Sequence, residues 1–160
     1  SGSFAVQLAK AAGAHVTAVD NAGKLAYLRS LGADAVIDYR VDDFTRRGPF
    51  DLVLDLVAHR SVRDYRRALA PGGRYRAVGG SVATMLGLLT AGTVLGRATG
   101  RRLGVLAVKP GPAHFTPLEE RYAAGEVRIH VDRTFSLDEV PEALTRVGEG
   151  RALGKVVVTP

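Results

Sequence analysis

The first residues of the chain constrain its fold most, because they indicate a helix that begins directly after a glycine-containing turn. Ser1-Gly2-Ser3 leads into an apolar helical pattern over residues 3–12, which Gly13 ends. A strand-like run follows at residues 15–20 and finishes in Asp20. The order of glycine turn, helix and strand is typical of the second half of a βαβ unit, whose helix N-terminus faces a phosphate group. The sequence therefore predicts an α/β fold.

The rest of the chain alternates short apolar runs with helical patterns, which indicates a parallel sheet covered by helices. Further strands are predicted at residues 35–38, 52–56, 75–78 and 103–108, and helices near residues 24–31, 61–69 and 117–124. Pro71-Gly72-Gly73 is predicted to end a helix and to turn the chain into the next strand. With no repeat or linker visible, we expect a single domain.

The C-terminal region follows a slightly different pattern. Ser136 and Glu139 have the spacing of a capping box, and the helix that they introduce is predicted to reach about residue 147. A short strand is predicted at residues 154–159.

Composition excludes several kinds of site. The chain has no cysteine, so disulfides, thiolate zinc ligands and a cysteine nucleophile are all ruled out. Its four histidines are dispersed, and we predict neither a metal site nor a catalytic residue on this chain. The net charge of +6 could suit nucleic acid. Because the arginines are spread along the sequence, however, nucleic acid is not the partner that we expect.

One apolar segment, residues 82–95, is the most membrane-like part of the chain. Glycines and threonines interrupt it, and it is shorter than the ~20 residues that span a bilayer. We expect it to be a buried or subunit-facing helical segment, with no membrane partner. No signal peptide pattern is visible, and a cytoplasmic location is expected.

Four segments together resemble the medium-chain dehydrogenase/reductase superfamily, and within it the quinone oxidoreductase-like branch, also called the zinc-binding dehydrogenase family. They are Gly2 with the helix after it, residues 31–39, residues 68–75 and residues 154–158. The order of these motifs is far more specific than a single glycine pattern. The resemblance implies an NAD(P)-binding domain over residues 1–160, with a Rossmann-type doubly wound parallel sheet and helices on both faces.

The resemblance also implies which family parts are expected to be missing from this chain. These are the N-terminal catalytic domain, which resembles the chaperonin GroES, and the first strand of the nucleotide fold. Without that strand, the strands containing Val19 and Val53 should each keep an unpaired edge. Residues 148–160 would return to the catalytic domain, and the isolated chain should have little or no turnover.

The family's cofactor contacts fall on several positions of this sequence. Gly2 and Ser3 would face the pyrophosphate at the helix N-terminus. Asp20 would accept hydrogen bonds from the adenosine ribose, which favours NADH. Lys24 and Tyr39 instead match positions that contact the 2′-phosphate of NADPH. We expect NAD(P)H as the cofactor, leaning to NADH with dual use left open.

Further contacts are implied at the ends of three later strands. The backbone and small side chains there would suit adenine, ribose and nicotinamide, and the residues are Leu56, Val57, Gly79, Gly80, Leu106, Ala107 and Val108. Asp55, at the end of one of these strands, is equally well explained as a capping carboxylate. The strand at residues 103–108 would also pair with a second copy, which predicts a homodimer.

The expected function is that of the cofactor-binding part of an NAD(P)H-dependent oxidoreductase, which transfers hydride to or from a quinone, carbonyl or activated alkene. A small-molecule substrate is then expected in the whole enzyme. Two alternatives stay open. One is a noncatalytic interaction or RNA-binding remnant of such an enzyme, which the basic charge permits. The other is a nucleoside-binding domain similar to methyltransferases.

Overall fold

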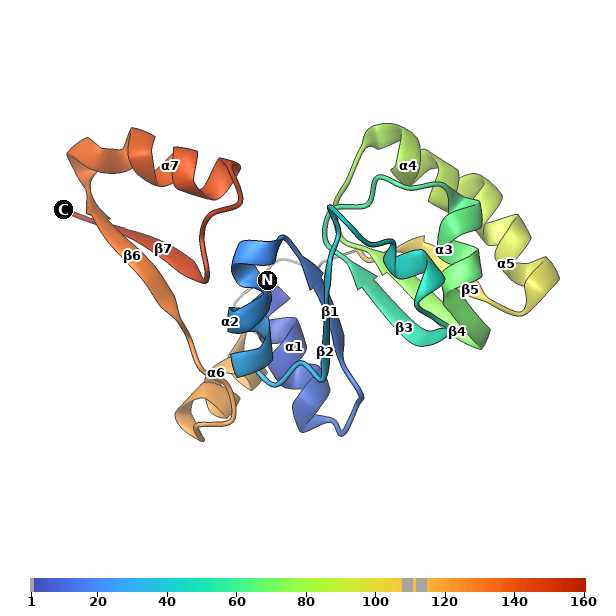
Figure 1. Ribbon diagram of the computed structural model, residues 1–160, viewed down its shortest axis with the longest axis horizontal. Coiled ribbons are helices and arrows are strands. Elements are labelled where there is room, and N and C mark those ends of the chain that lie inside the picture. Colours follow the sequence, from blue (N-terminus) through green and yellow to red (C-terminus); the bar gives the residue numbers. More distant parts are fainter. Residues whose placement is uncertain (1, 108–110, 112–114) are drawn as a thin grey trace. The chain divides into compact units, whose positions relative to one another are not determined.

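A computed structural model of the chain describes residues 2–107, 111 and 115–160. It consists of parallel strands with helices beside them, as the sequence predicts (Figure 1). The contacts divide the chain into two compact units. The first unit is Ser1–Arg40 with Gly111–Pro160, and the second unit is Val41–Pro110.

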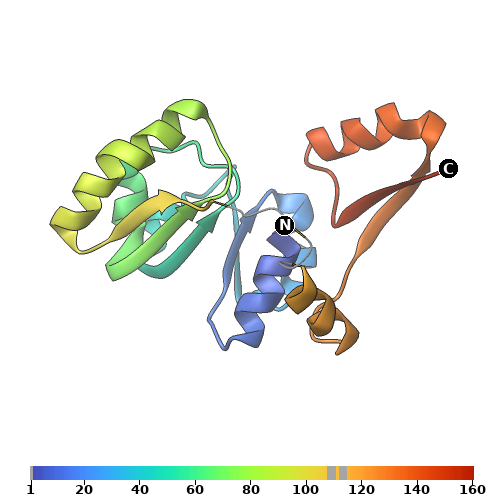
Figure 2. The ribbon, with the colours of Figure 1, turned by 180° about the vertical axis from the view of Figure 1, so that it is seen from behind.

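The first unit begins with an αβαβ segment. It contains α1 (Gly2–Ala11), β1 (Thr17–Asp20), the 3-10 turn η1 (Ala22–Lys24), α2 (Leu25–Ser30) and β2 (Ala35–Asp38). β1 and β2 are parallel, with Asp20 opposite Asp38. Both helices lie on one side of this pair (Figures 1 and 2), where Val6, Ala18 and Leu28 form a small buried core. The bounds of both helices and both strands agree with the sequence prediction to within two residues.

The C-terminal part of the first unit contains a second pair of parallel strands. Its elements are α6 (Thr116–Ala123), β6 (Val131–Ser136), the 3-10 turn η5 (Leu137–Glu139), α7 (Val140–Gly148) and β7 (Lys155–Thr159). β6 pairs with β7, and Phe135 is fully buried between β6 and α7. The predicted cap is present, because the Glu139 carboxylate accepts the Ser136 N–H at 2.8 Å. β6 was not predicted from the sequence.

The second unit is a three-stranded parallel sheet with its helices on one side (Figures 1 and 2). Its elements are η2 (Phe44–Arg46), β3 (Phe50–Asp55), α3 (Val62–Ala68), β4 (Leu69–Ala77), α4 (Val82–Gly87), the π-turn η3 (Leu88–Gly92), α5 (Thr93–Thr99) and β5 (Arg102–Val105). The strand order is β3-β4-β5. The largest members of its buried core are Tyr65, Leu69, Tyr75, Leu88 and Leu103.

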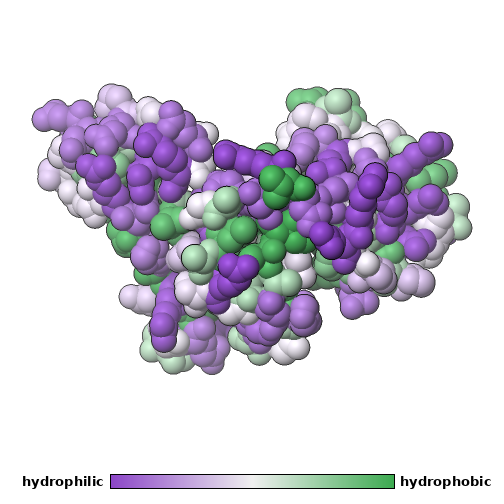
Figure 3. All heavy atoms as spheres, viewed as in Figure 1, coloured by the Kyte–Doolittle hydropathy of each residue, from purple (hydrophilic) through white to green (hydrophobic). Residues whose placement is uncertain are grey.

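One expectation about the second unit was wrong, and another, that residues 82–95 are buried or subunit-facing, is met only in part as far as burial goes. Pro71-Gly72-Gly73 does not separate a helix from a strand, because these residues lie within β4. A register shift between Phe50 and Leu52 on β3 absorbs the irregularity. The segment at residues 82–95 is not buried as a whole either: Leu88 and Gly92 are buried, but Val82 is 75% exposed. Hydrophobic side chains lie on the visible outer side of α4 and α5 (Figure 3).

Within the described residues, β1 is paired only with β2, and β3 only with β4. Each of these strands therefore keeps one edge without a strand partner, as expected from the sequence. In the same part of the chain, the continuous helical segment Val82–Thr99 is the one helix whose length and composition would allow it to cross a membrane.

Candidate functional site

The carboxyl end of β1 places a charged pair where the sequence predicts contacts with the adenosine ribose. The Lys24 ammonium lies 3.5 Å from the Asp20 carboxylate, and the two side chains are 18% and 32% exposed. The other Asp20 oxygen accepts the backbone N–H of Asn21 at 2.8 Å. The 3-10 turn η1 produces this arrangement, because it brings Lys24 back over the strand end four residues after Asp20. Asp20 is therefore already neutralised by a neighbouring cation.

A cavity of about 340 Å³ lies beside this pair in the first unit. Its lining combines three cations and one carboxylate with an asparagine, two glycines and a leucine: Asn21, Gly23, Lys24, Arg40, Glu149, Gly150, Arg151 and Leu153. Glu149 pairs with Arg151 at 2.6 Å. Arg40 has no ion-pair partner among the described residues. Guanidinium and ammonium groups are the donors that bind phosphate in proteins, so this cavity fits a phosphate-bearing ligand.

Tyr39 follows β2 and does not line that cavity, unlike Lys24. Its side chain is 47% exposed, and its backbone N–H donates to the Asp20 carbonyl at 3.2 Å. The Arg40 guanidinium lies 5.9 Å from the centre of the Tyr39 ring. The structure thus brings Asp20, Lys24 and Arg40 to one strand end and places the exposed ring of Tyr39 near Arg40.

Gly2 and Ser3 are the first residues of α1, as the sequence predicts. The amide N–H groups of a helix's first turn have no partner within the helix, and they carry its positive dipole end. The Ser3 carbonyl accepts the side-chain amide of Gln7 at 3.1 Å. Gln7 is buried, and its amide also exchanges hydrogen bonds with the backbone of Arg128. These contacts hold α1 to the chain segment that precedes β6.

The second unit brings the carboxyl ends of its three strands together. Backbone hydrogen bonds continue past each strand end, from Ala58 N to Gly79 O at 2.8 Å and from Leu106 N to Ala77 O at 2.7 Å. Leu56 and Val57, Gly79 and Gly80, and Leu106 and Ala107 therefore stand side by side along one edge. The predicted contact at Val108 lies outside the described residues. In open α/β sheets this edge is where ligands bind.

Gly80 explains why the edge is made of backbone. Its φ is +148°, and a Cβ atom at this position would lie 2.1 Å from the Ala58 carbonyl oxygen. No side chain can occupy that space without moving the loop after β3, because the obstructing atom belongs to the backbone of Ala58. The glycine thus lets two strand ends approach closely enough to pair at Ala58 and Gly80.

Two buried tyrosines hold the loop after β3 in place through hydrogen bonds. The Tyr75 hydroxyl donates to Asp55 Oδ2 at 2.7 Å, and Asp55 Oδ1 accepts the Val57 N–H at 3.1 Å. The Tyr65 hydroxyl accepts the N–H groups of His59 and Arg60 at 2.9 and 2.8 Å. The two rings stack with centres 4.0 Å apart. Burial raises the pKa of Tyr75 and of Tyr65, so both hydroxyls stay protonated.

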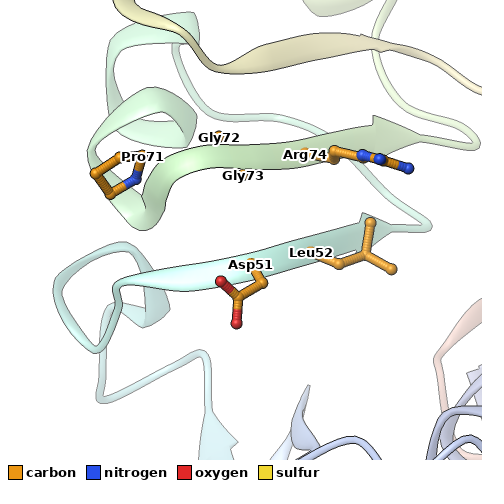
Figure 4. A pocket seen from close by; sticks show the side chains of 6 residues that line it. All are labelled: Asp51, Leu52, Pro71, Gly72, Gly73 and Arg74. Carbon is orange, nitrogen blue, oxygen red and sulfur yellow. The ribbon is translucent and has the colours of Figure 1, made fainter.

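A second hollow, of about 400 Å³, lies at the opposite end of this sheet (Figure 4). It is lined by Asp51 and Leu52 at the start of β3 and by the Pro71–Arg74 stretch of β4. These residues are near the amino ends of the strands, away from the edge at which open α/β sheets bind ligands. We therefore do not assign the cofactor to this hollow.

Comparison with known proteins identifies the family. The family model described as zinc-binding dehydrogenase matches residues 31–158. The chain belongs to the zinc-binding dehydrogenase family. The resemblance to quinone oxidoreductases and alcohol dehydrogenases that the sequence motifs indicated is thereby confirmed.

Its relatives include mouse (Mus musculus) NAD(P)H oxidoreductase RTN4IP1, mitochondrial, at 33% identity over 98% of this chain and 44% of the relative. Quinone-oxidoreductase QR1, chloroplastic, from Triphysaria versicolor is 31% identical over 99% of this chain and 49% of the relative. The solved quinone oxidoreductase of Coxiella burnetii is 26% identical, with a TM-score of 0.81 over 98% of this chain and 48% of that structure. The chain spans about half the length of these relatives.

The name of the zinc-binding dehydrogenase family raises the question of a metal. Among the described residues, no group of three or more histidine, aspartate or glutamate side chains is arranged to hold an ion. Cysteine, the other common zinc ligand, does not occur in the sequence. The residues present do not fit a zinc site, and we derive no step that uses one.

Arg40 and Arg151 are the residues at this site that sequence reasoning missed. They lie far apart in the sequence, and only the fold brings them to one cavity. Arg40 directly follows Tyr39, which is a predicted cofactor contact, and this adjacency could have pointed to Arg40 as a further contact. Arg151 lies just before the GKVVV motif, and nothing in its local pattern distinguishes it from other surface arginines.

Proposed function

We propose that this chain is the cofactor-binding part of an NAD(P)H-dependent oxidoreductase that transfers hydride to or from a quinone, carbonyl or activated alkene. The observation that carries the proposal is the edge formed by the ends of β3, β4 and β5, which is built from backbone and glycine. Such an edge accepts a flat ligand closely and offers main-chain donors and acceptors to it. Relatives named as NAD(P)H oxidoreductase and quinone oxidoreductase support the same reading.

The nicotinamide, when bound, supplies or accepts the hydride. The residues of this chain bind and orient the cofactor. In the first unit, the first turn of α1 and the cations of the 340 Å³ cavity are the groups suited to phosphates. In the second unit, considered by itself, the paired strand ends are suited to a flat ring. The Tyr65 and Tyr75 hydroxyls would keep the loop after β3 in place during this contact. A group that polarises the substrate is not assigned to this chain.

For the cofactor's phosphate preference, we propose NADPH over NADH. The sequence leaned to NADH because an unpaired Asp20 would repel a 2′-phosphate. In the structure Lys24 is paired with that carboxylate, and Arg40 and Arg151 add two guanidinium groups beside it. Arg40 has no competing carboxylate within the described part of the chain, which leaves its five donors open to a phosphate.

The test is a parallel titration of the protein with NADPH and NADH, followed by nicotinamide fluorescence and thermal stability. Replacing Arg40→Gln should weaken NADPH binding about tenfold, as expected for the loss of a charge-assisted phosphate contact, and should leave NADH binding unchanged. Arg29→Gln, an exposed arginine of α2 away from the cavity, is the matched control. Equal losses for both cofactors would contradict the 2′-phosphate assignment. Binding of neither cofactor would contradict the proposed function itself.

We also propose that two copies pair through β5. This strand is hydrogen-bonded to β4 on one side, and its other edge has no strand partner among the described residues. Light scattering on the purified protein tests the proposal, because a homodimer is expected and a monomer at all concentrations would contradict it.

A further inference from the structure

The outer side of the helix formed by α4, η3 and α5 carries an exposed apolar stripe. Its members are Val82, Leu86, Leu89 and Val94, which are 75%, 57%, 59% and 69% exposed. Two of the three spacings between neighbours in this stripe, four and three residues, are close to one helical turn, and the π-turn Leu88–Gly92 widens the turn before Val94. This widening brings Val94 back toward the line of the other three. Single exposed apolar residues are common on protein surfaces, but four large aliphatic side chains along one line of a helix form a contiguous patch, which is typical of an interaction site.

The opposite side of the same helix is already packed against the sheet. Leu88 is fully buried in the core with Tyr75 and Leu103. Added Cβ atoms at Gly92 and Gly96 would each lie 3.6 Å from the side chain of Leu103 on β5, so the helix lies close against this strand. The helix cannot leave the sheet to cross a bilayer without giving up this packing. The stripe can therefore contact an apolar phase only while the helix lies along its surface.

Three threonine hydroxyls of this helix are satisfied within the helix itself. The hydroxyls of Thr90, Thr93 and Thr99 donate to the carbonyl oxygens four residues earlier, at 2.8, 3.0 and 2.7 Å. Hydroxyls bonded in this way do not require water as a partner. The threonines that interrupt the apolar run in the sequence thus do not prevent contact with hydrocarbon.

The charge of the second unit favours an anionic surface. Residues 41–110 contain twelve arginines and lysines and five aspartates, which gives +7, whereas the rest of the chain has ten and eleven, which gives −1. No acidic residue occurs between Asp64 and Glu119.

In the helical layer itself, the one carboxylate in α3, α4 and α5 is Asp64, and Arg67 pairs with it at 3.2 Å. Arg63 and Arg66 of α3 and Arg97 of α5 have no ion-pair partner among the described residues. α3 and η3 share one buried core, so these arginines belong to the same layer as the stripe.

We propose that this helical layer binds the surface of an anionic lipid bilayer. The stripe would enter the boundary between headgroups and acyl chains, and Arg63, Arg66 and Arg97 would contact anionic headgroups. The combination of an exposed apolar helix with unpaired arginines and no free carboxylate is what such a surface requires. A second copy of this chain would place the same arginines close to one another, and this repulsion makes self-association through the stripe the less favourable arrangement.

The experiment is co-sedimentation of the purified protein with vesicles of phosphatidylcholine, alone or with about one third phosphatidylserine. The protein should sediment with the anionic vesicles, and high salt should weaken this binding. The double variant Leu86→Ser with Leu89→Ser should lower the partition coefficient at least tenfold. Its matched control is Leu137→Ser with Leu144→Ser, two leucines of the first unit that are 63% and 67% exposed, which should bind like the parent.

A second arm tests the charges. Arg63→Gln, Arg66→Gln and Arg97→Gln together should lower binding to anionic vesicles at least tenfold, since each surface arginine contributes about fivefold. The control removes three first-unit arginines, Arg29, Arg121 and Arg128, in the same way. Thermal unfolding of every variant shows that each is folded.

Failure of the parent protein to bind anionic vesicles overturns the proposal, as does an equal loss in the stripe variant and its control. In that case, light scattering tests whether a second copy of this chain contacts the stripe instead. An oligomer that the Leu86→Ser, Leu89→Ser variant converts to a monomer, without vesicle binding by the parent, makes the stripe a contact between copies. Cofactor titration is independent of all these outcomes, so the proposed function can stand or fall separately.

Discussion

Removing the buried hydroxyl of Tyr75 should destabilise the second unit. In Tyr75→Phe the ring can keep its stacking on Tyr65, and the loss is confined to the hydrogen bond from the hydroxyl to Asp55 Oδ2 at 2.7 Å. A hydrogen bond to a charged group contributes about 1.5–3 kcal/mol. Asp55 is partly exposed, so water can replace part of that bond. We therefore expect the free energy of unfolding to fall by about 1.5–2 kcal/mol, toward the lower end of the range.

Urea unfolding at neutral pH measures this loss, with an unchanged dependence on denaturant showing that the unfolded state is the same. Tyr122→Phe is the control, because that tyrosine is 54% exposed on α6 and makes no side-chain hydrogen bond within the described residues. It should change stability by less than about 0.5 kcal/mol. A Tyr75→Phe protein as stable as this control would refute the reasoning. It would mean that Asp55 needs only the Val57 N–H and solvent.

Three further outcomes are expected. Gly80→Ala should destabilise the protein by more than about 3 kcal/mol in urea unfolding and abolish cofactor binding, whereas Gly125→Ala, where no atom obstructs a Cβ, should cost only the strain of its positive φ. Leu88→Ala should cost about 2–5 kcal/mol, measured in the same way, because this side chain is fully buried. The Arg146 guanidinium holds the pKa of Asp132 below its usual value, so the stability from this pair is complete above about pH 4–5 and is lost as the pH falls through the lowered pKa. Asp132→Asn should flatten that part of the acid unfolding curve, and an unchanged curve would contradict the assignment.

Local patterns predicted the parts of the fold in which apolar residues and turn signals agree. β2 has the predicted bounds, because its apolar run is short and Gly32 with Asp34 marks its start. β6 was missed because its two apolar residues, Val131 and Phe135, are separated by three polar ones, so the segment shows neither an apolar run nor the alternation of a strand. Its pairing with β7 makes it a strand. At Pro71-Gly72-Gly73 the local turn preference persists as an irregularity inside β4, because Leu69 and Arg74 on either side pair with β3 while these three residues do not. Gly72 keeps a positive φ of +78° there.

The residues of the candidate site also fall into some that the sequence could predict and some that it could not. Asp20, Gly79 and Gly80 could be predicted because each ends a strand or follows one directly. Lys24 could be predicted only from the resemblance to the family. The grouping of Lys24 with Arg40 and Arg151 could not, since it depends on a contact between segments more than one hundred residues apart in the sequence. The exposure of the helix from Val82 to Thr99 was also hidden, because an apolar composition by itself does not distinguish a buried face from an uncovered one.

The close approach of Gly80 to Ala58 has a consequence for how such a protein can evolve. A contact made by backbone, in a space where a Cβ would lie 2.1 Å from a carbonyl oxygen, cannot be tuned by substitution. The cavity of Lys24, Arg40 and Arg151 is made of side chains, each of which a single mutation can exchange. Under the proposed function, recognition of the phosphate can therefore drift between cofactors over generations, while the surface that receives the reactive ring stays the same.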